Sequence, residues 1–194
     1  PRLQTLTDHW DEIKTLKAVP TVKVDGTSTT LSMDERGQVH VYSRNWELDS
    51  MSSNMQLAKR FQLDKMLWPG MAVQFELCGP GIQSNRLKLP AQRPFVFAVW
   101  KDHHKIDRDQ WPTGMPNLAV PELDENEWAL TGSVDDMIAK VDGLRGNVTK
   151  DRLDEGIVWH LREDQQLSEG LANELGANRC FKIINNKYLT KNGL

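Results

Sequence analysis

The sequence predicts an α+β fold in which antiparallel sheets are flanked by helices. Most segments that carry chemically useful residues are apolar or alternating runs of strand length. Residues 34–37, Asp-Glu-Arg-Gly, form a hairpin signal that makes the strands on either side antiparallel. Residues 52–67 repeat apolar side chains at helical spacing, which predicts a helix that lies on a sheet.

The elements follow one another from the N-terminus. A short amphipathic helix is predicted to begin at Thr7 or Asp8, either of which can cap it, and to end near Val19 and Pro20. Strands at 22–33 and 39–43 then form a β-meander, and Pro69-Gly70 ends the helix that follows. The other predicted elements are strands at 71–78, 94–101 and 156–161, helices at 134–144 and 167–175, and a late strand around 181–185.

Composition excludes several classes of protein. The chain has 24 Lys and Arg against 27 Asp and Glu, so its net charge of -3 gives no general attraction to polyanions, and any such site must be local. No apolar run approaches the roughly 18 residues of a membrane span, so no membrane partner is expected. Cys78 and Cys180 form no CxxC pair, which is typical of a reducing compartment and predicts a cytoplasmic, intracellular protein.

Five short segments share one property: each places a charged residue at or beside the end of a predicted strand. Lys23-Val24-Asp25-Gly26 alone is weak, because a KxDG match arises by chance at about the one-in-fifty level. The charged residues occur in the order lysine, arginine, glutamate, glutamate, lysine. The five segments are 23–26 (KVDG), 42–45 (YSRN), 75–83 (FELCGPGIQ), 155–158 (EGIV) and 181–185 (FKIIN).

In this order the segments resemble the covalent nucleotidyltransferases, the superfamily of ATP-dependent DNA and RNA ligases and mRNA capping enzymes. The chain is most similar to the nick-sealing RNA ligases, because residues 76–83 and 181–189 match that branch beyond the minimal motifs. The resemblance covers about residues 20 to 190 and implies that residues 1–194 form one ATP-grasp-like nucleotidyltransferase (adenylyltransferase) domain. The accessory OB-type domain of such ligases is expected to be absent from this chain.

The resemblance implies a catalytic role for two lysines. Lys23 is the expected nucleophile, because an amine can hold AMP as a phosphoramidate and pass it to a 5′-phosphate. Such an amine must lose its proton near neutral pH, and partial burial and nearby positive charge favour that loss. Lys182 matches the lysine that contacts the α-phosphate, and it is expected to supply part of that charge.

Other residues are expected to bind ATP and a divalent cation, Mg²⁺ or Mn²⁺. By the resemblance, Arg44 and Glu76 contact the ribose and Phe97 stacks on adenine. Many relatives have a glutamate before the nucleophile where this chain has Val22, so any adenine contact there must use the backbone. Asp25 and Glu155 are the expected metal residues, since Mg²⁺ prefers oxygen ligands.

Each of these residues also has a structural interpretation. Lys23 could be a solvated edge-strand lysine, Glu76 and Glu155 ordinary ion-pair partners, and Phe97 a core residue. Arg44 could cap the hairpin, and Lys182 could point into solvent from a buried strand.

Residues 102–107 contain adjacent histidines, yet adjacent strand residues face opposite ways, so a solvated turn is favoured over a zinc site. Three basic residues could track a phosphate backbone or form a plain charged surface: Arg86, Lys88 and Arg93.

The favoured function is an ATP-dependent RNA ligase that forms lysyl-AMP at Lys23 and joins 5′-phosphate to 3′-hydroxyl ends. The expected partners are ATP and RNA or an RNA-containing duplex, and a monomer is expected. A capping-type guanylyltransferase is the nearest alternative. The other is a nucleotide-binding module without catalysis, favoured by Ile184, where many relatives have a second basic residue that Lys187 could replace, and by the missing accessory domain.

Overall fold

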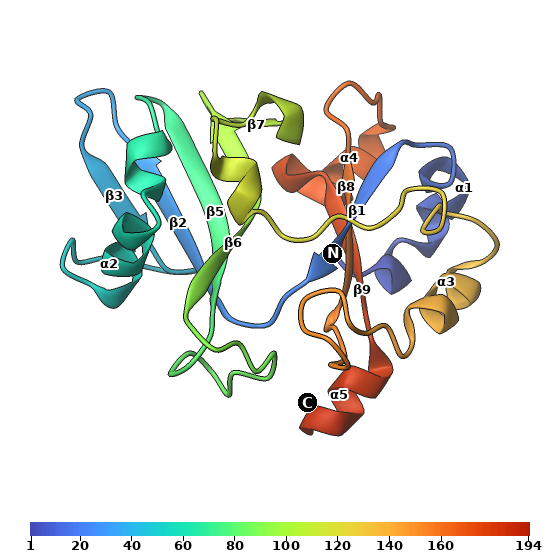
Figure 1. The fold of residues 1–194 in the computed structure, drawn as a ribbon. Helices are drawn as coiled ribbons and strands as arrows, with labels where there is room; N and C mark the ends of the chain where they lie inside the picture. Colours follow the sequence, from blue (N-terminus) through green and yellow to red (C-terminus); the bar gives the residue numbers. More distant parts are fainter. The chain divides into compact units, whose positions relative to one another are not determined.

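Residues 1–194 are all described by the computed structural model, and they form two compact units (Figure 1). Unit 1 comprises Pro1–Val24 and Pro121–Leu194, and unit 2 comprises Asp25–Val120. Each unit has its own antiparallel sheet and its own hydrophobic cluster. The chain leaves unit 1 after Val24, so the KVDG segment is divided between the two units.

Unit 1 is built on a three-stranded antiparallel sheet with the order β1-β8-β9. Val22, Ile157 and Ile183 lie side by side across the sheet and make one face apolar. The neighbouring residues of each strand therefore point to the opposite face, which carries the polar side chains. The strands are β1 (Ala18–Lys23), β8 (Gly156–Leu161) and β9 (Cys180–Ile184).

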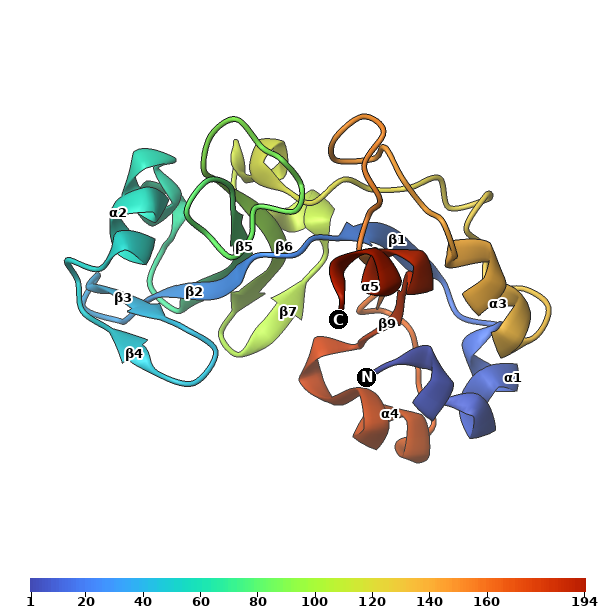
Figure 2. The same ribbon diagram turned by 90° about the horizontal axis from the view of Figure 1, so that it is seen from below.

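Helices cover the apolar face of this sheet. Trp10, Met137 and Leu171, one from each of three helices, join the same buried cluster as Ile157 and Phe181. Ser133 caps one helix in a reciprocal capping box with Asp136. Figure 2 shows the N-terminal segment beside β9, where the Lys182 N–H donates to the Pro1 carbonyl at 3.0 Å. The helices are α1 (Trp10–Ile13), α3 (Val134–Val141), α4 (Glu169–Leu175) and α5 (Asn186–Asn192), with 3-10 turns at Leu3–Thr5, Thr7–His9 and Gly176–Asn178.

Unit 2 is built on a six-stranded antiparallel sheet with the order β4-β3-β2-β5-β6-β7. Val73, Phe75 and Leu77 of β5 are buried on one face, against the helix α2, while Gln74 and Glu76 point to the other face. The strands are β2 (Thr27–Met33), β3 (Val39–Tyr42), β4 (Glu47–Leu48), β5 (Met71–Cys78), β6 (Arg93–Lys101) and β7 (His104–Ile106). α2 spans Ser53–Arg60, and 3-10 turns span Leu63–Met66, Arg108–Gln110 and Met115–Leu118.

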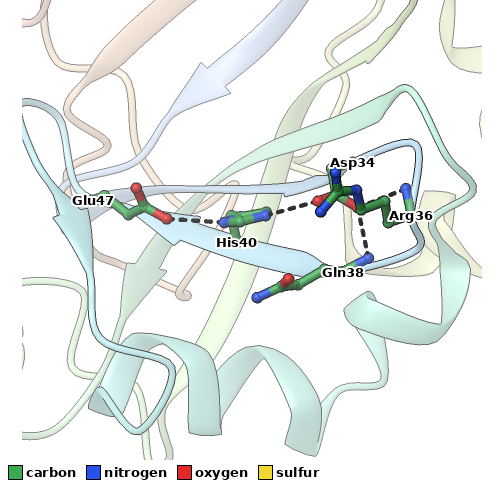
Figure 3. A network of polar contacts seen from close by, with 5 residues as sticks. All are labelled: Asp34, Arg36, Gln38, His40 and Glu47. Carbon is green, nitrogen blue, oxygen red and sulfur yellow. Dashed lines mark hydrogen bonds and ion pairs between the residues drawn. The ribbon is translucent and has the colours of Figure 1, made fainter.

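The hairpin between β2 and β3 forms where the sequence predicts it. The Asp34 carboxylate accepts hydrogen bonds from the Arg36 and Gln38 N–H groups at 2.9 and 2.8 Å, which closes the turn (Figure 3). On the adjoining strands, His40 bridges Glu47 Oε1 at 2.9 Å and Asp34 Oδ2 at 3.4 Å. These contacts raise the pKa of His40 above its usual value, the bond to Glu47 being the largest cause.

The α+β prediction is confirmed, and several boundaries are corrected. The strand predicted at 22–33 is wrong as a single element: β1 ends at Lys23 and β2 begins at Thr27 in the other sheet. The first helix is also shorter than predicted, because Val19 and Pro20 belong to β1. The helix predicted at 52–67 stops at Arg60, because Gln62 adopts a left-handed backbone with φ of 59°.

Three further predictions concern the histidine turn, the cysteines and the membrane. Asp102 and His103 form a tight turn between β6 and β7, with φ of 49° and 66°, as favoured over a zinc site. Neither Cys78 nor Cys180 forms a disulfide. None of the helices is long and apolar enough to cross a membrane. The cellular location stays a prediction.

Candidate active site

Lys23 and Glu155 form the central contact of unit 1. Lys23 is the last residue of β1, and its Nζ lies 2.6 Å from Glu155 Oε2. The side chains are 23% and 14% exposed, so the amine is neither in bulk water nor sealed in the core. A charge-assisted hydrogen bond of this length holds the lysine side chain at one place on the sheet.

Gly156 brings Glu155 to this position. The pair Lys23 and Gly156 closes the β1–β8 ladder, so the residue before Gly156 falls beside the end of β1. A Cβ at Gly156 would collide with the Ile183 carbonyl of β9. The glycine in this Glu-Gly pair therefore allows β9, which carries Lys182, to approach β8 closely.

Lys182 lies on the same face of the sheet as Lys23. It is paired with Val158, which is paired in turn with Thr21, two residues before Lys23. Burial is the largest cause that lowers the pKa of Lys182, and repulsion from the Lys23 ammonium is the second. Glu155 opposes the shift. The structure thus brings two lysines and one glutamate of the predicted site together in unit 1.

Two residues on this face were not predicted from the sequence. Thr21 Oγ1 lies 3.0 Å from His160 Nε2 and 3.3 Å from the Val158 carbonyl. Both residues share a face with Lys182, because Thr21 pairs with Val158, Val158 pairs with Lys182, and His160 lies two residues after Val158. Thr21 is itself buried, so only the strand register could have identified these residues.

Asp25 belongs to unit 2 and forms a different ion pair. Its Oδ2 lies 2.6 Å from Arg86 Nη1, and both side chains are about four-fifths buried, with 19% and 20% exposed. Asp25 lies two residues beyond the end of β1 and so does not share a face of that strand with Lys23. Arg86 neutralises a carboxylate here, and Arg93 stacks over the Phe95 ring at 4.5 Å.

Gly26 packs against the end of β5, beside Glu76. A Cβ at Gly26 would collide with the Leu77 carbonyl and lie 2.7 Å from Cys78 Sγ. Cys78 Sγ also donates to the Asp25 carbonyl at 3.5 Å. The glycine of the KVDG segment is thus required for this packing, which sets Asp25 next to the strand that carries Glu76.

Arg44 and Glu76 lie at the same end of the unit 2 sheet. Thr30 pairs with Tyr42, so continuing that register places Arg44 level with Ser28, which pairs with Glu76. Arg44 is exposed in the turn between β3 and β4.

Phe97 is the extra residue of a β-bulge. Gln74 pairs with Ala98 and Phe75 pairs with Val96, so Phe97 has no partner on β5. A bulge redirects side chains, and Phe97 is partly exposed while both neighbouring residues on β6 are buried. The choice between the two roles that the sequence left open for Phe97, stacking on adenine and packing in the core, stays a prediction.

Val22 already uses its backbone N–H within the fold. Its side chain is buried at 1% exposure, and its N–H donates to the Pro121 carbonyl at 2.9 Å. An adenine contact by Val22 would therefore use the carbonyl. Ile184 is buried opposite Gly156.

The carboxylates of the predicted site do not form a complete metal site by themselves. A divalent cation here would also need oxygen ligands from a bound substrate or from water. No group of three or more His, Cys, Asp or Glu side chains gathers to hold a metal. Glu155 is partly exposed and carries an anionic oxygen pair, which fits the usual mode of Mg²⁺, in which one or two carboxylates act with substrate phosphates and waters.

Comparison with known protein families gives one match. The sequence profile of the family described as RNA ligase matches residues 17–184 of this chain. That range includes all of the predicted site residues. None of the curated protein sequences is similar enough to count as a relative.

Solved structures of one enzyme resemble this chain throughout. The Naegleria gruberi RNA ligase with PPi superposes with a TM-score of 0.79 at 25% identity, over 99% of this chain. Two variants of that ligase with ATP and Mn give TM-scores of 0.77 at 25% identity and 0.74 at 26% identity, each over 99% of this chain. This chain covers 56% of the length of each of those chains.

Proposed function

We propose, since this chain belongs to the RNA ligase family, that it is the adenylyltransferase part of an ATP-dependent RNA ligase and forms a covalent lysyl-AMP at Lys23. The observation that carries the proposal is the contact between Lys23 Nζ and Glu155 Oε2 at 2.6 Å. It holds a partly buried amine at a strand end, where a solvated surface lysine would have no fixed position.

In the proposed first step, Lys23 Nζ attacks the α-phosphorus of ATP. A P–N bond forms, the bond from the α-phosphorus to the bridging oxygen breaks, and pyrophosphate leaves with the electron pair. Before it attacks, Lys23 must be released from Glu155, and its ammonium must give one proton to water. Lys182, the second cation on this face, would stabilise negative charge on the α-phosphate.

Glu155 has two tasks in this account. Before ATP binds, its carboxylate holds the Lys23 amine. Mg²⁺ or Mn²⁺, when bound, would supply neutralisation of phosphate charge. Glu155 is the proposed protein ligand, and the ATP complexes of the Naegleria ligase, which contain Mn, support this metal requirement by similarity. Because Asp25 is paired with Arg86, we propose it as a weaker contributor that acts through waters.

Unit 2 is proposed to recognise the nucleoside. Arg44 and Glu76 would contact the ribose, which their common level at one end of the sheet supports. Phe97 would stack on adenine, supported by its partly exposed place at the bulge. Val22 would contribute its carbonyl.

The proposed later steps join two nucleic-acid ends. AMP passes from Lys23 to a 5′-phosphate, and a 3′-hydroxyl then displaces AMP to form the phosphodiester. RNA or an RNA-containing duplex is the proposed substrate. This chain spans about half the length of the Naegleria ligase. The first step is the one that the residues of unit 1 support.

The experiment is transfer of label from α-labelled ATP or GTP, with Mg²⁺ or Mn²⁺, to denatured protein. We expect label from ATP only, lost in Lys23→Ala and also in Lys23→Arg, because a guanidinium stays protonated and does not attack phosphorus. Lys17→Ala is the matched control, since Lys17 is exposed one residue before β1.

Each other result favours a different function. Label from GTP would indicate a capping-type guanylyltransferase. No label from either nucleotide on folded protein would indicate a nucleotide-binding module without catalysis. Full labelling of Lys23→Arg would exclude Lys23 as the nucleophile.

A further inference from the structure

Asn185 has an unusually complete set of hydrogen bonds for a residue outside the proposed chemistry. It lies between β9 and α5 and is 0% exposed. Its Oδ1 accepts from the N–H groups of Gly143 at 3.0 Å, Lys187 at 3.1 Å and Tyr188 at 3.4 Å. Its Nδ2 donates to the carbonyls of Leu144 at 3.0 Å and Asp154 at 2.9 Å.

These bonds join both ends of the segment that leads into Glu155. The segment runs from α3 to β8, with Gly143 and Leu144 at one end and Asp154 at the other. Besides the side-chain bonds, the Asn185 N–H donates to the Glu155 carbonyl at 2.9 Å. Asp154 N–H donates to the Leu144 carbonyl at 3.0 Å, which closes the same ring of contacts.

Glu155 depends on these contacts for its position. The β1–β8 ladder begins at Gly156, so the Glu155 peptide lies outside the regular pairing that aligns the two strands. Asn185 is the residue that holds the Glu155 carbonyl and the Asp154 carbonyl before it. The side chain held in this way is the one that contacts Lys23 Nζ at 2.6 Å.

We propose that Asn185 is a positioning residue that fixes Glu155, the proposed metal ligand, beside Lys23 and so sets the rate of lysine adenylylation. The inference rests on the proposed function of Lys23. Asn185 touches neither Lys23 nor the reacting atoms and acts only through the backbone of residues 154 and 155. A buried amide whose donors and acceptors all make hydrogen bonds cannot shift without losing some of them.

The test uses Asn185→Asp, which keeps the shape of the side chain and an oxygen for the three N–H donors. It replaces the donor that faces the Leu144 and Asp154 carbonyls with an acceptor. We expect the single-turnover rate of adenylate transfer at saturating ATP to fall at least about tenfold. The ATP concentration for half-maximal rate should change less than about threefold, because no ATP contact is removed.

A double-mutant cycle separates positioning from general damage. In a Glu155→Gln background, Asn185→Asp should slow the reaction less than about twofold, because the group that it positions is already missing. An equal loss in both backgrounds would overturn the proposal, as would an unchanged rate in the single variant. Ser133→Ala removes the cap of α3 in the same unit and serves as the control, with an unchanged rate per folded molecule.

A second readout needs no ATP and remains decisive if the wild-type chain forms no adenylate. Trace acylation of lysines by an amine reagent, measured by peptide mass spectrometry, reports how well each amine is protected. Asn185→Asp should raise the reactivity of Lys23, relative to exposed Lys17, at least about threefold, since the partner carboxylate is displaced. An unchanged ratio would contradict the role of Asn185. Absence of adenylate in the wild type would contradict the proposed function alone.

Discussion

The carboxylate of Glu155 and the amine of Lys23 meet where β8 begins and β1 ends, 2.6 Å apart on one face of the sheet of unit 1. The two residues are separated by 132 positions in the sequence. The pairing of Lys23 with Gly156 and the hydrogen bond from the Asn185 N–H to the Glu155 carbonyl bring them together. The same face carries Lys182, whose pKa is lowered by burial and by the charge of Lys23.

Replacing Glu155 should affect catalysis more than stability. We expect Glu155→Gln to lower the rate of lysine adenylylation at least about tenfold, because the metal loses its proposed carboxylate ligand. The cost to the free energy of unfolding should be about 1 kcal/mol, since the pair is partly exposed. Stopped labelling reactions and urea unfolding measure the two effects. A stability loss with unchanged labelling would make this a purely structural ion pair.

Lys182 should reduce stability while it supports function. A lysine whose pKa is lowered in the folded state binds protons more weakly there than in the unfolded chain, so its charge opposes folding. Lys182→Met should therefore raise the melting temperature at pH 7. It should also abolish most labelling, because it removes the cation that is proposed to stabilise the α-phosphate. The gain should be full below the folded-state pKa and vanish as pH rises to the ordinary lysine value of about 10.4.

The control for this prediction is Lys191→Met, on the exposed side of α5. It should change neither the labelling nor the melting temperature appreciably. A lower melting temperature for Lys182→Met at pH 7 would show that Lys182 stabilises the fold.

His40 should make the stability of unit 2 depend on pH. Its pKa is raised, first by Glu47 and then by Asp34, so the protonated ring stabilises the folded hairpin (Figure 3). That contribution is present below the unfolded value of about 6.5 and is lost as pH rises through the higher folded value. Melting curves between about pH 5.5 and 8.5 should show this loss in the wild type and a flatter dependence in His40→Gln. If the melting temperatures of the wild type and His40→Gln changed in parallel with pH, the His40 contacts would not be the source of the pH dependence.

Phe97 provides a direct test of binding against packing. Phe97→Ala should raise the ATP concentration for half-maximal labelling about tenfold, the usual size of one lost base-stacking contact. The melting temperature should fall little, because the ring is partly exposed at a bulge. Phe95→Ala, at a position only 3% exposed, should show the reverse. Matched losses of stability at both positions would assign Phe97 to the core.

Gly26 should tolerate no side chain. Gly26→Ala forces a Cβ into the Leu77 carbonyl and should cost about 3 kcal/mol or more of unfolding free energy. Gly37→Ala meets nothing within 4 Å, so its left-handed backbone, with φ of 78°, should cost only about 1 kcal/mol. Equal costs by urea unfolding would mean that the packing against β5 relaxes easily.

The sequence predicted the strands that alternate or are strongly apolar, and it failed where two sheets share one run of residues. Met71–Cys78 and Gly156–Leu161 have the predicted bounds because each is flanked by turn residues. Residues 22–33 read as one strand, because nothing local marks that residues 24–26 pass from one unit to the other. The β-propensity of a segment does not reveal which strand that segment pairs with.

The same limit applies to the site. The order of motifs along the sequence identified Lys23, Glu155 and Lys182. The strand register then brings these three residues together. The Asp25–Arg86 pair and the hydrogen bonds of Asn185 could not be named, because they join segments through loops whose paths no periodicity fixes.

The central claim is that Lys23 carries the nucleotide, and peptide mass mapping after incubation with ATP and a divalent cation tests it most directly. We predict a mass increase of one adenylyl group, confined to the peptide that contains Lys23 and localised to its side chain by fragmentation. An adenylyl group found on Lys182 or on another residue, with Lys23 unmodified, would contradict the account.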